Sequence, residues 1–147
     1  MGLEAKSIFS LERSGPQVKR SSSEFDRSNP QTEVFLMEPI HLYEKAEFSK
    51  DNFVPKQIHI GDAGAAVLIC FEPGQAMPSH PHPGALEVIL YGVEGEGTLA
   101  IGDEEKPFNK GDLVFCKGEV PIGPKNTGQG KFIVLVILVL KQLVSKG

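Results

Sequence analysis

The 147-residue sequence has only two cysteines, no surplus of positive charge and no apolar segment long enough to cross a membrane. Its 15 Lys and Arg residues are outnumbered by 19 Asp and Glu residues, which gives a formal net charge of -4. Such a chain has little excess charge with which to neutralise nucleic-acid phosphates or anionic lipid. The longest apolar run, residues 132–140, is half the length of a transmembrane helix. We therefore expect no nucleic acid and no membrane among its partners.

The two cysteines, Cys70 and Cys116, both lie within apolar stretches, and the N-terminus shows no apolar segment typical of a secretory leader. This pattern favours reduced core cysteines over a disulfide. A single domain of this length buries roughly 70% of its unfolded surface, so it needs no disulfide framework. The sequence therefore predicts a cytoplasmic protein.

Residues 1–33 differ in composition from the rest of the chain. They hold seven serines, and five basic residues are balanced by five acidic ones. The apolar residues among them are too sparse to form a core. We expect a polar N-terminal arm over residues 1–33, followed by one folded domain over residues 34–147.

Short apolar segments recur between turn signals from residue 34 onward, and helical periodicity is nearly absent. Thirteen of the 16 glycines fall between Gly61 and Gly130, where long helices are therefore excluded. This pattern is typical of an all-β sandwich or barrel. Strands are expected at residues 34–37, 53–60, 65–72, 77–82, 86–93, 98–101, 113–116 and 132–140.

The expected strand at residues 132–140 is apolar at every position, whereas a strand with one wet face would alternate. One of its faces can pack inside a barrel, and the other needs a cover of its own. An exposed apolar patch of that size on a monomer would promote aggregation. We therefore expect a homodimer, with strands or the N-terminal arm at the interface.

Two histidines and a glutamate carry the chemistry that the sequence suggests. His80 and His82 are two positions apart, so on a strand they project from the same face with roughly 7 Å between their α-carbons. The turn at Pro83-Gly84 would return Glu87 near His82 on the neighbouring strand. Two imidazoles and one carboxylate with open positions suit Fe, Mn, Ni, Co or Zn. The spacing predicts a divalent-metal site at these three residues, although short His pairs also occur by chance.

The segment Gly74-x5-His80-x-His82-x4-Glu87, continued to Gly95, resembles the first conserved motif of the cupin superfamily. A second stretch, residues 111–126, is similar to the second cupin motif in its spacing. The resemblance covers residues 53–140 well and residues 34–52 loosely. It implies a small jelly-roll β-barrel, the double-stranded β-helix, which is commonly dimeric and has its site inside the barrel mouth.

Two departures from the family pattern concern the site. Seven residues separate Glu87 from Gly95 where the family pattern has six, which predicts a β-bulge near Tyr91-Gly92. The position of the family's last metal-binding histidine holds Ile122, which cannot ligate a metal. Water or a substrate oxygen would then take the vacant coordination position.

Two functions stay open at the level of sequence. One is a metal-dependent enzyme of the oxygenase or isomerase type acting on a small organic molecule. The other is a noncatalytic small-molecule-binding cupin with a degenerate metal site, since the fold alone does not define function. The expected pocket residues include no Lys or Arg, which favours a small neutral or aromatic ligand. These residues are Phe71, Met77, Ile89, Tyr91, Phe115 and Ile122.

Overall fold

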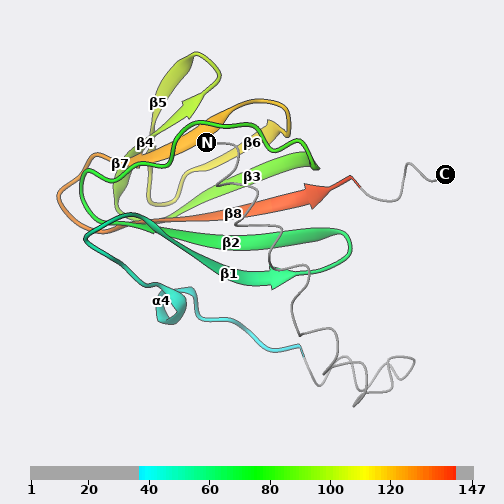
Figure 1. Cartoon of the computed structure of the whole chain (residues 1–147). Helices are drawn as coiled ribbons and strands as arrows, with labels where there is room; N and C mark the ends of the chain where they lie inside the picture. Colours follow the sequence, from blue (N-terminus) through cyan, green and yellow to red (C-terminus); the bar gives the residue numbers. More distant parts are fainter. Residues whose placement is uncertain (1–36, 142–147) are drawn as a thin grey trace.

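The structure, a computed structural model, describes residues 37–141, which form two antiparallel β-sheets (Figure 1). The expected arm over residues 1–33, and nearly all of the strand expected at residues 34–37, lie outside the described residues. In residues 37–141, no helix is long and apolar enough to span a membrane. The elements in chain order are α4 (Leu42–Lys45), β1 (Val54–Ile60), β2 (Gly64–Phe71), β3 (Ala85–Glu94), β4 (Glu96–Ile101), β5 (Glu104–Asn109), β6 (Leu113–Lys117), β7 (Ile122–Asn126) and β8 (Phe132–Leu140).

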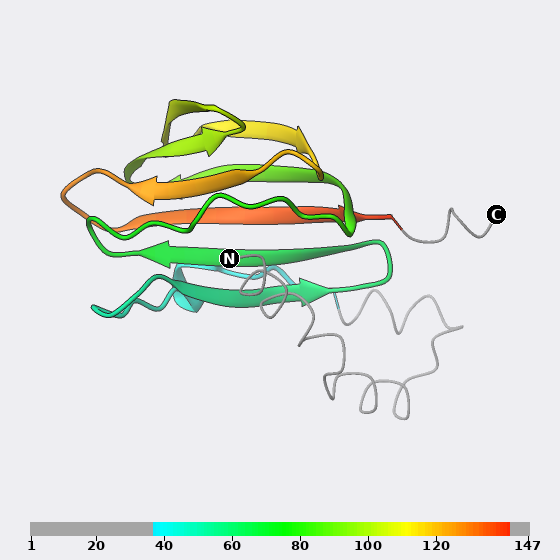
Figure 2. The same ribbon diagram turned by 45° about the horizontal axis from the view of Figure 1, so that its top comes forward.

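The described strands divide into a large sheet with the order β1-β2-β8-β3-β6 and a small sheet with the order β5-β4-β7. After β3 the chain passes to the small sheet for β4 and β5 and returns to the large sheet for β6. It then crosses to the small sheet for β7 and returns to the large sheet for β8 (Figure 2). This repeated crossing joins the two sheets into a jelly roll. The all-β fold class predicted from the sequence is confirmed.

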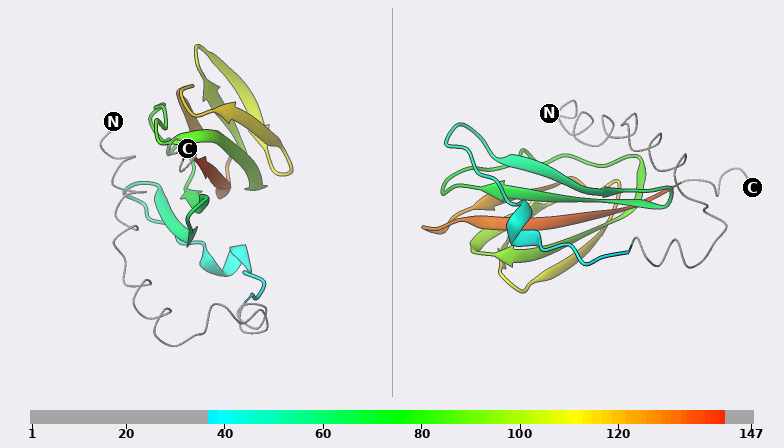
Figure 3. Two further views of the ribbon diagram at one scale, coloured as in Figure 1. Left: turned by 90° about the vertical axis from the view of Figure 1, so that its right-hand side faces the viewer. Right: turned by 90° about the horizontal axis from the view of Figure 1, so that it is seen from below.

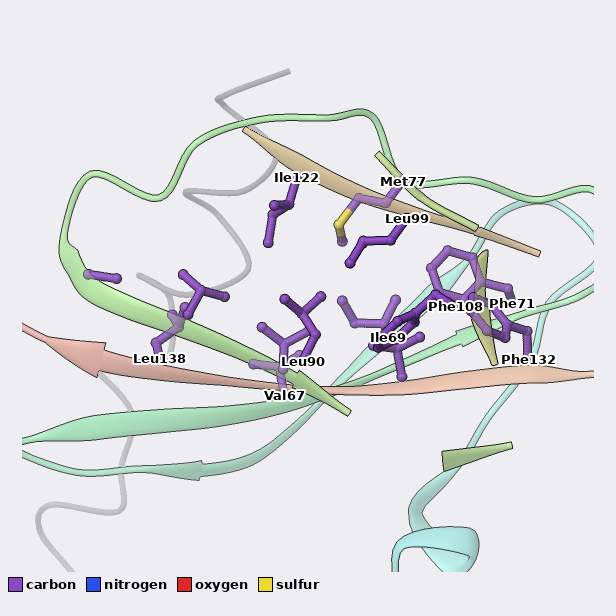
Figure 4. Packing of buried hydrophobic residues seen from close by; sticks show 14 residues of the cluster. Val67, Ile69, Phe71, Met77, Leu90, Leu99, Phe108, Ile122, Phe132 and Leu138 are labelled. Atoms are coloured by element: carbon purple, nitrogen blue, oxygen red, sulfur yellow. The ribbon is translucent and has the colours of Figure 1, made fainter. Parts of the chain in front are cut away.

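The main core lies between the two sheets. Alternate residues of β2 face inward, as expected of a strand whose side chains point to opposite faces in turn. The small sheet contributes buried side chains from all three of its strands, and Figure 4 shows Ile122 and Met77 directed toward Val67 and Leu90 on the large sheet. Burial of each such side chain contributes about 1.5 to 3 kcal/mol of hydrophobic stabilisation.

Gly95 connects β3 to β4 and so carries the chain from the large sheet to the small one. Its φ angle is 91°, in the left-handed region that favours glycine. A Cβ atom at this position would lie 2.1 Å from the carbonyl oxygen of Lys131. The turn therefore requires glycine for both its backbone conformation and its close approach to the neighbouring chain segment.

The segment of residues 42–48 covers part of the outer face of the large sheet. Leu42, Ala46 and Phe48 pack against a second cluster of buried side chains that includes Leu68 and Ile133. Figure 3 shows α4 on the side of the large sheet away from β4, β5 and β7. This cover reaches the end of β3, where the Tyr43 hydroxyl donates to the Glu94 carboxylate at 3.0 Å.

Six of the expected strands correspond to β1, β2, β3, β4, β6 and β8. The strand expected at residues 77–82 is instead an irregular segment with isolated bridges at Ala76 and His80, because its prolines have no N–H to donate to a ladder. The sequence did not indicate β5 and β7, which contain Pro107 and Pro124. Both are edge strands of the small sheet, where proline is tolerated.

Candidate functional site

The two histidines lie on the irregular segment of residues 72–84, which joins β2 to β3 and runs beside β7 (Figure 2). The N–H of Met77 donates to the carbonyl oxygen of Pro124 at 2.9 Å, and that of His82 donates to the carbonyl oxygen of Gly118 at 2.8 Å. His80 and Ile122 donate to each other's carbonyl oxygens at 3.0 Å. Backbone hydrogen bonds thus hold the segment in place at the position of each histidine.

His80 is 5% exposed, and its ring orientation is set by its own chain segment. Its Nδ1 atom lies 2.7 Å from the carbonyl oxygen of Pro78. Because a carbonyl oxygen can only accept a hydrogen bond, this contact places the proton on Nδ1. The Nε2 atom then carries a lone pair, and it is buried without a hydrogen-bond partner among the described residues.

His82 is 8% exposed, and its ring centroid lies 4.5 Å from that of His80, with the ring planes tilted by 45°. Burial, and to a smaller extent the charge of His80, lowers the pKa of His82 to about 4. At neutral pH the His82 ring is therefore uncharged. The pair thus places the uncharged His82 ring beside the buried His80 ring in an apolar environment.

Glu87 does not lie with the histidines, which differs from the expectation drawn from its spacing. Ala85 pairs with Leu140 and Glu87 pairs with Val139, so Leu86 is an extra residue in β3 and forms a β-bulge. In a regular strand, residues 85 and 87 would share one face. The bulge breaks this alternation, so that Ala85 is buried while the Glu87 side chain is exposed on the outer face of the large sheet.

Val88 is the buried residue that faces the interior at this level of β3. Six residues separate Val88 from Gly95, which is the family's spacing between its glutamate and this glycine. The residue of β3 that faces the interior is therefore found by counting six residues back from Gly95, and not by counting forward from the histidines. The bulge predicted near Tyr91-Gly92 is confirmed, because the register with β8 shifts between Gly92 and Glu94.

The other expected pocket residues divide between the two faces of the large sheet. Phe71, Met77 and Ile122 are buried in the core between the sheets. Tyr91 is 39% exposed and Phe115 is 65% exposed, and both lie on the outer face with the half-buried Ile89. These last three residues were expected to share a face with Glu87, and they do so, but that face is the outer one.

The described residues do not fit a metal centre with three protein ligands. Within residues 37–141, no group of three or more His, Cys, Asp or Glu side chains comes together. Catalytic metal sites usually have three protein ligands. His80 and His82 supply two nitrogens, while Glu87 lies on the outer face and Ile122 has no donor atom.

The chain has two antiparallel sheets around an apolar core, and a buried histidine pair on the segment that joins β2 to β3. These features define a small jelly-roll protein of the double-stranded β-helix class. Residues 67–138 match the family model Cupin_2, which describes a cupin domain. The chain belongs to the cupin superfamily, as its motifs predicted.

Solved structures support the same assignment. The structure of TT1209 from Thermus thermophilus is 25% identical over 71% of this chain and 98% of that chain, with a TM-score of 0.66. A double-stranded β-helix protein from Klebsiella pneumoniae is 20% identical over 72% of this chain and 92% of that chain, with a TM-score of 0.67. A predicted oxalate decarboxylase from Thermotoga maritima is 22% identical over 59% of this chain and 81% of that chain, with a TM-score of 0.53. The comparison with curated proteins found no match.

Proposed function

We propose that this chain is a noncatalytic cupin that binds a small neutral or aromatic molecule beside His80 and His82. One observation carries the proposal: two buried imidazoles lie together, while Glu87 faces outward and Ile122 fills the family's fourth ligand position. The site therefore retains hydrogen-bonding nitrogens in apolar surroundings, and within residues 37–141 it lacks the donor set of a three-ligand metal centre. Such a combination of an apolar environment with a few placed polar atoms is typical of small-molecule sites.

The ligand chemistry follows from the proton positions. His80 Nδ1 is occupied by the Pro78 carbonyl oxygen, so Nε2 is an acceptor. An acceptor in an apolar environment selects a ligand with an O–H or N–H donor, because leaving either group unpaired costs about 1 to 3 kcal/mol. The other buried polar side chain in the described residues, Asn126, is already bonded to the carbonyl oxygens of Phe71 and Gly130. With no buried cation among the described residues to hold an anion, the ligand class is neutral.

The test is a binding screen of the full chain with small neutral aromatic and heterocyclic molecules that carry one hydrogen-bond donor. Ligand-detected NMR identifies binders, and isothermal titration measures their dissociation constants in His80→Phe, which keeps an aromatic ring but removes Nε2. The matched control is His59→Phe, which changes an exposed histidine on β1. We expect the first variant to weaken binding about tenfold or more, equivalent to about 1.4 kcal/mol, and the control to leave it unchanged. Equal affinities in both variants would overturn the proposed recognition.

A metal-dependent enzyme of the oxygenase or isomerase type is the second candidate. The observation that favours it is the His80 Nδ1 to Pro78 carbonyl contact, because metal-ligating histidines usually donate their second ring N–H to such a group. Elemental analysis of protein purified without chelator separates the two candidates. One equivalent of Fe, Mn, Ni, Co or Zn, lost in His80→Ala and in His82→Ala, would support the second candidate and exclude the first.

A further inference from the structure

The outer face of the large sheet carries apolar side chains that are partly or largely exposed. Strand pairing aligns them in two rows across β8, β3 and β6, and partners in a ladder point to the same side of the sheet. Phe115 is 65% exposed, Leu113 is 55% exposed and Tyr91 is 39% exposed, which together leave on the order of 300 Å² of surface uncovered. A contiguous apolar patch of this size commonly marks an interaction site. The six residues of these rows are called the outer patch: Ile137, Ile89 and Phe115 in one row, and Leu135, Tyr91 and Leu113 in the next.

The outer patch adjoins the part of this face that the chain already covers. Leu135 belongs to the patch and also packs against the buried cluster beneath residues 42–48. The Tyr43 hydroxyl lies 3.3 Å from the carbonyl oxygen of Val93, two residues along β3 from the patch. Followed from α4 back to Met37, the chain runs in the direction in which β8 points (Figure 1). The chain that precedes α4 therefore begins at the edge of the outer patch.

The residues just upstream of α4 have the composition that such a patch requires. Residues 34–37, Val-Phe-Leu-Met, are four consecutive apolar residues, and they coincide with the first strand expected from the sequence. Met37, the only one of the four among the described residues, is 69% exposed. Within residues 1–33, by contrast, large apolar residues are adjacent only at Ile8-Phe9, among ten charged residues and seven serines. Residues 34–37 are therefore the apolar segment best suited to cover the outer patch.

The short connection to α4 favours this segment over any free partner. Only residues 38–41 separate residues 34–37 from α4. Four extended residues span up to about 14 Å, and the three strands of the patch together are about 10 Å wide, so the segment can reach each of them. A segment on so short a linker has an effective concentration in the millimolar range at a surface that it can reach. A second molecule at micromolar concentration competes at a disadvantage of roughly a thousandfold.

We propose that residues 34–37 dock on the outer patch of their own chain and so extend the cover that residues 42–48 begin. Phe115 lies beneath the docked segment, which runs over the outer faces of β8, β3 and β6. This docking covers the outer side of β8, a strand that is apolar at every position and needs cover on both faces. The outer patch is then a docking surface for the chain's own upstream segment, and other proteins can reach it only when that segment leaves.

The sequence contains no tryptophan, so Phe115→Trp in the full chain provides a single fluorescence probe in the outer patch. We expect blue-shifted emission and weak quenching by acrylamide, because the docked segment shields the indole. Adding Phe35→Glu and Leu36→Glu together removes the apolar contact whichever of the two faces the sheet, and should raise the quenching constant about threefold. The matched control, Ile8→Glu with Phe9→Glu, adds the same charges at another adjacent apolar pair and should leave the quenching unchanged. An indole that is fully exposed before the glutamates are added would overturn the proposal.

A mixing experiment distinguishes docking within one chain from docking between two chains. The Phe115→Trp chain is refolded from urea together with a roughly tenfold excess of chains that carry Phe35→Glu and Leu36→Glu without the probe. Docking within one chain leaves the quenching constant of the probe unchanged. A quenching constant that rises in the mixture would show that the segment comes from a second copy, which would overturn the proposal. Tyr91→Trp repeats both measurements in the other row of the patch, and circular dichroism checks that every variant keeps its fold.

Discussion

His80 and Ile122 are paired in an antiparallel bridge, with two N–H to carbonyl hydrogen bonds of 3.0 Å between their backbones. Residues paired in this way lie about 5.5 Å apart at their α-carbons and project their side chains to the same side. The side chain at position 122 therefore lies next to the His80 ring. A single substitution at position 122 can therefore test whether the family's last metal-binding histidine would complete a site with His80 and His82.

Ile122→His should complete a group of three imidazoles with His80 and His82. Without metal, a histidine buried in the core without a partner costs about 1 to 3 kcal/mol, so the melting temperature should fall. Added Ni²⁺ or Zn²⁺ should restore it, because metal that binds the folded state stabilises it by mass action. Differential scanning calorimetry with and without metal measures both effects. The control is Ile122→His combined with His80→Phe, in which the loss of stability should remain and the recovery should disappear.

The lowered pKa of His82 predicts a pH dependence of stability. The folded-state pKa of about 4 lies below the usual value of 6.5, so between these two values the unfolded chain binds more protons at this residue. The contribution of His82 is therefore fully present above about pH 6.5 and is lost as the pH falls toward 4, an effect on the order of 3 kcal/mol. Urea unfolding at a series of pH values measures it.

His82→Gln provides the comparison for this pH series. The difference in unfolding free energy between the wild type and His82→Gln should shrink as the pH falls from about 6.5 to about 4, whereas His59→Gln should follow the wild type throughout. A difference that stays constant across this range would show that His82 titrates normally in the folded protein. His59 serves as a control because it is exposed on β1.

Glu87 and Val88 are adjacent in sequence but lie on opposite faces of β3. Glu87→Gln alters an exposed side chain and should change the free energy of unfolding by less than about 0.5 kcal/mol. Val88→Glu places a carboxylate in the core and should cost more than about 3 kcal/mol. Urea unfolding at neutral pH measures both. A large loss of unfolding free energy in Glu87→Gln would contradict the outward position of Glu87 and would indicate that its carboxylate lies inside the barrel near the histidines.

Gly95 and Gly102 form a matched pair of turn glycines, with φ angles of 91° and 61°. Alanine at Gly102 meets no atom within 4 Å and should cost only the backbone strain, about 1 kcal/mol. Alanine at Gly95 adds a collision with the Lys131 carbonyl oxygen and should cost several kcal/mol more. Thermal unfolding of the two variants compares them, and similar melting temperatures would show that the β3–β4 turn can move away from Lys131.

The sequence allowed the strands of the large sheet to be predicted because their apolar residues are dense and their turns carry glycine. It did not allow β7 to be predicted, because Gly123 and Pro124 resemble a loop and only the pairing with β4 makes them a strand. The histidines were found from their spacing alone. Glu87 was assigned to the same site because the turn at Pro83-Gly84 was expected to form a hairpin that returns it near His82. The histidine segment instead bonds to Ile122 and Gly118, and the bulge at Leu86, which follows from pairing with β8, turns Glu87 to the outer face.

The two bulges of β3 have a consequence for how the sequence of such a barrel can evolve. Between Ala85 and Glu94, β3 uses two residues more than the part of β8 from Ile133 to Leu140 that it pairs with. Each bulge shifts the register of β3 by one residue. Between the two bulges, each residue of β3 therefore faces the side of the sheet opposite to the one it would face if the first bulge were absent. Which residues face the barrel is thus set by chain length as well as by residue type. Insertion or loss of one residue near position 86 can exchange a carboxylate for a valine inside the barrel without any substitution, and so can remove or restore a ligand in one step.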